Sequence, residues 1–235
     1  MKLSEVMSEL KSLGSEQTVK IYRNHGADGD MYGVKIADLK KILRRVKGDQ
    51  ELALQLWDTG NSDAMYLAGL LANGTQMTKR QLDGWAKSAW WYMLSEHAVP
   101  FAAGEHPDAL AIGMKWMKAK KENVASSGWT TYTAAISVLP DAELDKAELK
   151  SLLKRIEQEI DEAPNRVRYC MNSFVIASGS FVKSMFGAAK STAKKIGKVQ
   201  VDVGNTSCRV PLATEQLEKI KSMDRLGQKR KSVKC

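Results

Sequence analysis

One segment of this 235-residue chain gathers the side chains best suited to act on a bound ligand. It has three adjacent aromatic residues, followed within five positions by a hydroxyl, a carboxylate and an imidazole. These residues are Trp90, Trp91, Tyr92, Ser95, Glu96 and His97. Aromatic rings stack on nucleobases or shield a cationic ligand, and a neighbouring carboxylate or imidazole can transfer protons. On a helix, Trp91 and Ser95 share one face, while Tyr92 and Glu96 share the next.

Each of these residues also has a structural interpretation. For any single tryptophan, filling a gap between helices is the better explanation, and for His97 a hydrogen-bonded position on a helix is favoured. The other histidines are His25 and His106, and no HxxxH or HExxH spacing occurs. The sequence therefore predicts no metal site. It also contains no GxxxxGK[ST] phosphate-binding loop.

Three groups of basic residues are candidates for contacts with a polyanion. One lies on an amphipathic segment within residues 35–47, one opens the segment after residue 165, and one lies in residues 183–198. The predicted contact residues are Lys35, Arg44, Arg45, Arg166, Arg168, Lys183, Lys190, Lys194 and Lys198. Each group alone is better explained as a solvated face, whereas stacked helices that bring the groups together would form a groove for a polyanion.

The position of the net charge supports a polyanionic partner. The chain has 36 Lys+Arg and 27 Asp+Glu, a formal net charge of +9. Residues 183–235 hold 13 basic and 4 acidic residues, a net of +9, so residues 1–182 hold 23 of each and are neutral overall. We therefore expect the last quarter of the chain to form one end of the groove and to dominate its affinity.

Apolar residues recur at spacings of three and four along most of the chain, which predicts about a dozen helices joined by short links. The clearest stripe consists of Leu149, Leu152, Leu153, Ile156 and Ile160. Helix pairs that recur about every 35–45 residues favour an all-α solenoid of HEAT-like helix pairs over an irregular helical globule. The exception is the alternating-valine segment near 198–211, which predicts a short strand, a hairpin or an extended loop.

We expect one HEAT-like repeat domain over residues 1–227 and a basic C-terminal tail over residues 228–235, which is frayed and solvated. The three cysteines, Cys170, Cys208 and Cys235, show no CxxC spacing, which argues against a disulfide framework. No signal peptide and no apolar run of the ~18 residues that a membrane span needs are present. We expect a cytoplasmic monomer without a membrane partner.

Motifs spread over most of the chain resemble the AlkD-like DNA alkylation repair family. They are Arg23–Gly26, Tyr32–Lys35, Leu56–Asn61, Trp90–Trp91, Gly128–Trp129, Asn165–Phe174 and Gly197–Val199. The resemblance implies a HEAT-like repeat protein that clasps duplex DNA on a basic concave face. It also implies a DNA glycosylase that needs no cofactor and releases N3- or N7-alkylated purines, without deep insertion of the base into a pocket. The cleft aromatics would be Trp90, Tyr92, Trp129 and Tyr132.

The sequence departs from the family at the position of the catalytic acid. In the family pattern a tryptophan, matched here by Trp91, is followed four residues later by an aspartate, but this chain has Ser95. The aspartate would stabilise the cationic sugar that forms as the N-glycosidic bond breaks. A full charge lost at ~4 Å costs several kcal/mol even at an effective dielectric constant near 20. Glu96 would lie about 100° further around a helix, which makes it a poor substitute.

Two further departures fall in the same cleft. The family places an arginine where this chain has Tyr132 or Thr133, and a further tryptophan where it has Ser173 or Phe174. Three functions remain open. The first is an active glycosylase that uses a different cleft, with Trp90, Trp91, Tyr92, Trp129 and either Glu96 or His97. The others are a non-catalytic binder of damaged, bent or branched DNA and a protein-interaction scaffold. A neutral or acidic concave face would favour the scaffold.

Overall fold

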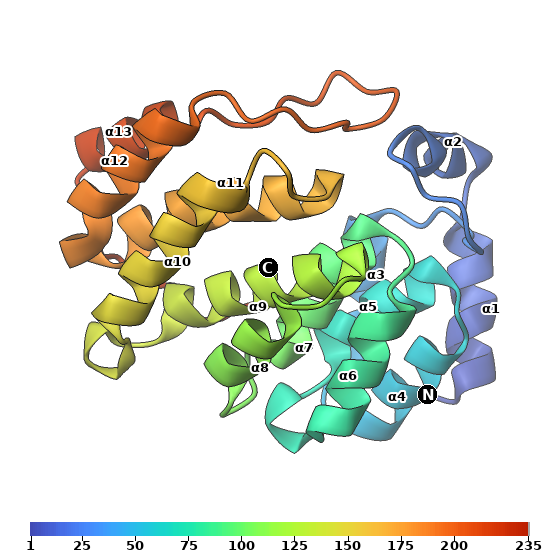
Figure 1. Ribbon diagram of the computed structural model, residues 1–235. Coiled ribbons are helices and arrows are strands. Elements are labelled where there is room, and N and C mark those ends of the chain that lie inside the picture. Colours follow the sequence, from blue (N-terminus) through green and yellow to red (C-terminus); the bar gives the residue numbers. More distant parts are fainter. Residues whose placement is uncertain (235) are drawn as a thin grey trace.

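The computed structural model describes residues 1–234, and the regular elements in that range are helical. Three helices form the N-terminal part, and ten more form five consecutive pairs (Figure 1). The N-terminal helices are α1 (Leu3–Leu13), α2 (Glu16–Asn24) and α3 (Ile36–Val46). The pairs are α4 (Gln50–Asp58) with α5 (Ser62–Leu71), α6 (Lys79–Ser88) with α7 (Val99–Ala103), α8 (Ala109–Trp116) with α9 (Glu122–Val138), α10 (Lys146–Glu159) with α11 (Asn165–Phe181), and α12 (Phe186–Ile196) with α13 (Ala213–Ser222).

Shorter helical turns link these elements. A π-helical turn, η2 (Leu94–Ala98), leads directly into α7. The 3-10 turns are η1 (Gly74–Gln76), η3 (Asp141–Glu143) and η4 (Lys183–Met185). The pairs begin at residues 50, 79, 109, 146 and 186, so the first two repeats are shorter than the predicted spacing. The predicted all-α solenoid of helix pairs is confirmed.

The second helices of the first four pairs, α5, α7, α9 and α11, form what we call the inner row. Successive members of this row contact one another, and α11 continues the contacts to α13. Every residue of α5 is buried, whereas α4 and α6 bury one face each. The apolar core forms two clusters, one built mainly from the N-terminal half and the other from residues 117–217. The inner row is therefore the rigid spine against which the other helices pack.

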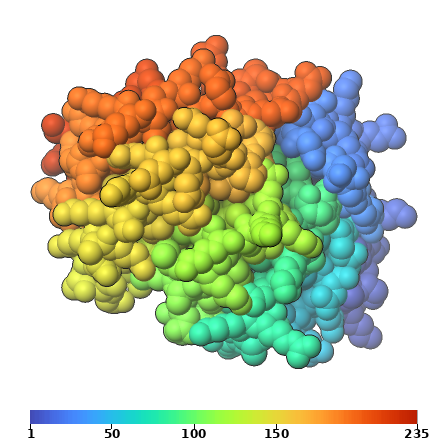
Figure 2. Space-filling view, in the orientation of Figure 1, coloured from blue at the N-terminus to red at the C-terminus, as the bar shows by residue number. Residues whose placement is uncertain are grey.

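The segment between α12 and α13, residues 197–212, is an extended loop, which we call the bridging loop. It leaves the end of α12, reaches α2 and returns to α13 (Figures 1 and 2). At its tip the Asn205 amide donates to the Asn24 carbonyl at 2.9 Å. No strand pairs with this segment among residues 1–234, so its alternating valines yield an extended chain and not a sheet.

The C-terminal segment differs from the frayed tail that we predicted. Val233 is buried with 4% exposure, and the Arg230 amide donates to the Ser137 carbonyl at 2.7 Å. The segment runs back over the body of the protein. There it donates hydrogen bonds to the last carbonyls of inner helices, which have no partner within their own helix. Within residues 1–234, no helix has the length and apolar character required to cross a membrane.

Candidate functional site

A cavity of about 300 Å³ lies where the N-terminal ends of inner helices meet the bridging loop. Its walls come from the turn after α2, from the aromatic segment, from the first turns of α9 and α11, and from the loop itself. The lining residues are His25, Gly26, Ala89, Trp90, Trp91, Tyr92, Ser95, Glu122, Asn123, Ser126, Asn165, Arg166, Asp202, Val203 and Gly204. The structure thus brings together Trp91 and Ser95, the two residues that the family pattern pairs.

The π-helical turn presents Ser95 to this cavity. Pro100 has no N–H to donate to the residue four positions earlier, so the regular α-helical ladder is interrupted before α7. The Val99 amide instead donates to the Leu94 carbonyl, five residues back. The Ser95 carbonyl accepts a bond from the Ser127 hydroxyl at 2.8 Å, which ties the turn to α9. The residue Ser95 is itself 3% exposed.

Both tryptophans of the segment are fixed through their indole N–H groups. Trp91 donates to the His25 carbonyl at 3.0 Å and lies 6% exposed against Tyr22. Trp90 is half-buried and donates to the Gly60 carbonyl at 3.2 Å. The two indole rings stack at 6.3 Å with an interplanar angle of 20°. A flat aromatic wall is therefore fixed before any ligand arrives.

Glu96 points away from Ser95 and forms a buried ion pair with Arg166. Arg166 Nε donates to Glu96 Oε1 at 2.7 Å, and Arg166 Nη2 donates to Oε2 at 2.6 Å. The guanidinium also lies over the rings of Tyr92 and Tyr169, at 4.3 and 4.6 Å. Burial raises the pKa of the Glu96 carboxyl, and the bonds from Arg166 oppose that shift. Glu96 is thus committed to this pair, and the charge of Arg166, predicted for a DNA phosphate, is already balanced.

His97 lies outside the cavity lining. Its imidazole is half-buried, with the Phe101 ring centroid at 6.3 Å. Burial, followed by the nearby positive charge of Arg166, lowers the pKa of His97 to about 4. The imidazole is therefore neutral near pH 7.

The predicted cleft aromatics divide into two pairs. Trp90 and Tyr92 line the cavity, whereas Trp129 and Tyr132 lie in the core with 0% and 1% exposure. Phe174 packs against both core rings, with centroids at 5.4 and 5.8 Å. Their placement in the cleft is therefore corrected, because the face of α9 that carries them packs against α11.

Sequence reasoning missed the polar groups that complete the cavity wall. Glu122 opens α9, and its Oε1 accepts the Arg166 amide at 2.7 Å. Asn165 opens α11 and exchanges two hydrogen bonds with the backbone of Asp202, at 2.8 and 2.7 Å. In sequence these residues look like ordinary helix-start residues, and only the fold brings them together. With Arg166 balanced by Glu96, the carboxylates of Glu122 and Asp202 make the cavity lining acidic.

Several predicted phosphate contacts are engaged within the protein. Lys190 pairs with Glu218 at 2.5 Å, and Arg45 pairs with Glu9 at 2.5 Å. Arg44 lines a separate groove near the C-terminal segment. Arg168 is half-buried, and its Nε atom is enclosed without a hydrogen-bond partner. Lys190, Arg45 and Arg168 are therefore less available to one continuous basic face than predicted, whereas Arg44 remains exposed.

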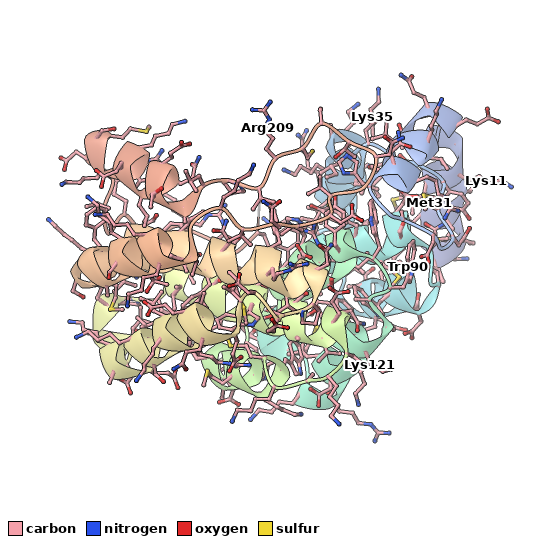
Figure 3. The ribbon with its side chains drawn as sticks, turned by 45° about the horizontal axis from the view of Figure 1, so that its top comes forward. Lys11, Met31, Lys35, Trp90, Lys121 and Arg209 are labelled. Carbon is pink, nitrogen blue, oxygen red and sulfur yellow. The ribbon has the colours of Figure 1, made fainter. Side chains whose placement is uncertain are left out.

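Other basic residues remain exposed. Lys35 caps the start of α3, and Lys183 opens η4. Lys194 lies in the last turn of α12, and Lys198 is the second residue of the bridging loop. Arg209, which the sequence analysis did not single out, is exposed on the same loop and projects away from the body of the protein (Figure 3). Within residues 1–234, no three His, Cys, Asp or Glu side chains are grouped so that they could hold a metal ion.

Comparison with known proteins places these features in a family. The family model for DNA alkylation repair enzymes matches residues 6–181. Uncharacterised proteins of Listeria innocua and Listeria monocytogenes are each 37% identical over 221 residues, which cover 92% of this chain and 95% of either relative.

A solved structure agrees with this chain along its whole length. It covers 100% of both chains with a TM-score of 0.91 and 33% sequence identity. It is described as representing a new family of proteins related to the HEAT-like repeat DNA glycosylases, with affinity for branched DNA structures. Together with the motifs around Trp91, these matches confirm the predicted resemblance. The chain belongs to the DNA alkylation repair enzyme family, in its HEAT-like repeat form.

Proposed function

We propose that this protein binds branched DNA and does not hydrolyse N-glycosidic bonds. The proposal of DNA binding rests on structural similarity to a protein with affinity for branched DNA, which extends over the full length of both chains. Exposed cations that support phosphate contacts are Lys35, Lys194, Lys198 and Arg209. Such contacts supply affinity without base sequence specificity, which suits recognition of DNA shape.

The cavity supports the second part of the proposal. Ser95 stands where the family's acid would stabilise an oxocarbenium-like sugar, and a neutral hydroxyl supplies no charge. The adjacent Glu96 is held by both bonds to Arg166. The bridging loop adds Asp202, Val203 and Gly204 to the same cavity wall as Ser95.

A competition measurement tests the binding. Fluorescence anisotropy would measure the affinity for a four-way junction and for a linear duplex of matching base sequence. Both would be measured at salt concentrations of about 50 to 200 mM. We expect the junction to bind more tightly, and both affinities to fall steeply with salt because counterions are released. Equal affinities for the two DNAs would contradict structure recognition. Undetectable binding to both would favour the scaffold interpretation.

A base-release activity is the second candidate, and one specific observation favours it. The carboxylates of Glu122 and Asp202 line the same cavity as Trp91. Either one offers the negative charge that Ser95 lacks. Incubation of the wild type with methylated duplex DNA tests this candidate. Release of free N3- or N7-methylpurine above the buffer rate, abolished by Glu122→Gln or Asp202→Asn, would replace our proposal.

A further inference from the structure

We propose that residues 227–234 form a strap that ties the C-terminal ends of the inner row together and thereby sets the spacing of the opposite ends at the cavity. The inference rests on contacts within the protein and does not depend on its binding DNA. It concerns the segment that sequence alone identified only as a charged tail.

The first half of the strap bonds to α11 and α9. Gly227 adopts a positive φ of 78°, which turns the chain, and its amide donates to the Ser180 carbonyl at 2.7 Å. The Arg230 amide then donates to the Ser137 carbonyl at 2.7 Å. These carbonyls belong to the last turns of α11 and α9. Lys229 reinforces the α9 contact, because its ammonium donates to the Ile136 carbonyl at 3.0 Å.

The second half reaches α7 and α5. Val233 is 4% exposed, and its Cγ1 lies 3.3 Å from the position that a side chain at Gly104 would occupy, directly after α7. The Lys234 ammonium donates to the Ala72 carbonyl at 2.5 Å, and Ala72 caps the end of α5. The same ammonium pairs with Glu105 at 2.9 Å. The eight residues 227–234 thus contact the ends of all four inner helices.

The chemistry of the strap matches the ends that it contacts. The last carbonyls of a helix have no intrahelical partner, and the aligned peptide dipoles make that end negative. Backbone amides and lysine ammonium groups are the donors that satisfy such carbonyls. Lys229 and Lys234 are only 21% and 20% exposed, and both also pair with carboxylates, Asp141 and Glu105. These two cations are therefore structural parts of the fold and do not add to a DNA-binding surface.

The strap also links parts of the chain that a solenoid leaves unconnected. In stacked repeats each pair contacts its neighbours, so the two ends of a row are coupled only through the intervening interfaces. The strap passes from α11 to α5 in one short segment. The N-terminal turns of α9 and α11 line the cavity, about 25 Å away along helices of 17 residues. A change of tilt at the strap end therefore changes the separation of helix starts at the cavity end.

Hydrogen exchange of individual amides tests the strap in the full-length protein. The variants are Lys229→Met and Lys234→Met, which keep the aliphatic chain and remove the ammonium. Lys231→Met is the matched control, because it removes the same charge from an exposed residue of the same segment. We expect the Arg230 amide to exchange about tenfold faster in either variant than in the control, as loss of a charged hydrogen bond predicts. We also expect faster exchange of the Arg166 amide, which bonds to Glu122 at the cavity.

The double variant separates a strap from two independent helix caps. If the segment acts as one unit, either substitution releases it, and the double variant exchanges at Arg230 no faster than the faster single variant. The strap would be overturned if the exchange rate of the Arg230 amide in the double variant rose by the product of the two single effects. It would also be overturned if that amide exchanged at the same rate in Lys234→Met as in Lys231→Met. An unchanged Arg166 amide would overturn the coupling to the cavity. None of these readouts contains DNA, so a failure to bind branched DNA leaves them unaffected.

Discussion

Arg166 holds both carboxylate oxygens of Glu96, at 2.7 and 2.6 Å, across 70 positions of the chain. The pair joins the π-helical turn to the start of α11, and both side chains are largely enclosed, with 3% and 18% exposure. It is therefore a structural connection across the cavity wall. It also removes the carboxylate nearest in sequence to Ser95 from a catalytic role, which supports the proposal of binding without base release.

Breaking this pair from one side should be costly. Glu96→Gln leaves the Arg166 guanidinium enclosed without its counter-charge, and we expect a loss of about 3 kcal/mol in the free energy of unfolding. Urea denaturation measures this loss. The double variant Glu96→Gln with Arg166→Met should be less destabilised than Glu96→Gln alone, since no unpaired charge remains. A loss below about 1 kcal/mol in the single variant would show that the pair is no more than a surface contact.

His97 should make stability depend on pH below neutrality. Its pKa is about 4 in the folded protein against 6.5 for the free side chain, so only the unfolded chain gains a proton between these values. The stabilising contribution is complete above pH 6.5 and is lost as the pH falls toward 4, by about 3 kcal/mol in total. Unfolding curves of the wild type and His97→Gln, measured across this range, isolate the contribution. Parallel pH profiles would contradict it.

The contact between the bridging loop and α2 should require glycine at position 204, because there is no room for a side chain there. This glycine has a φ of 78°, and a Cβ atom there would lie 2.2 Å from the Asn24 carbonyl oxygen. Gly204→Ala should therefore detach the loop tip and speed hydrogen exchange of the Asn205 amide, with little change in global stability. Gly84→Ala, which meets open space on α6, is the control and should leave that amide unchanged.

Neighbouring lysines on α12 should differ in their contribution to DNA binding. Lys194 is exposed, whereas Lys195 pairs with Glu157 at 2.7 Å. Log affinity falls as log salt concentration rises. If Lys194 contacts a phosphate, Lys194→Gln makes the slope of this line less steep by about 1. Lys195→Gln removes the same formal charge and should change the slope less. Anisotropy titrations at several salt concentrations compare the two, and equal slopes would remove Lys194 from the interface.

Restoring the acid tests what Ser95 decides. Ser95→Asp places a carboxylate on the cavity wall beside Trp91, and we expect it to confer release of N7-methylpurine from methylated duplex DNA that the wild type lacks. Ser95→Asn is the matched control, because it has the same shape without the charge. Release by both Asp and Asn variants would show that charge is not the missing element, and release by neither would show that other departures in the cavity also matter.

The fold was largely determined by local pattern. The apolar spacing of segments such as Leu149–Ile160 predicts their helices, because burial of one face needs only a period near 3.6. The motifs around Trp91 pointed to the family. The cleft position that the resemblance implied for Trp129 and Tyr132 was wrong, since the sequence does not show which face of α9 meets α11.

Tertiary structure alone decided which charges remain available. Glu96, Lys190, Lys229 and Lys234 look in sequence like free ionic groups, yet each is bound to a partner at least 28 positions away. It also brought Glu122 and Asp202, 80 positions apart, to one cavity. Such pairings depend on how whole helices stack, and no spacing within one helix encodes them. Sequence determined the helices and the family, whereas the stacking decided which side chains form the cavity and which hold the fold together.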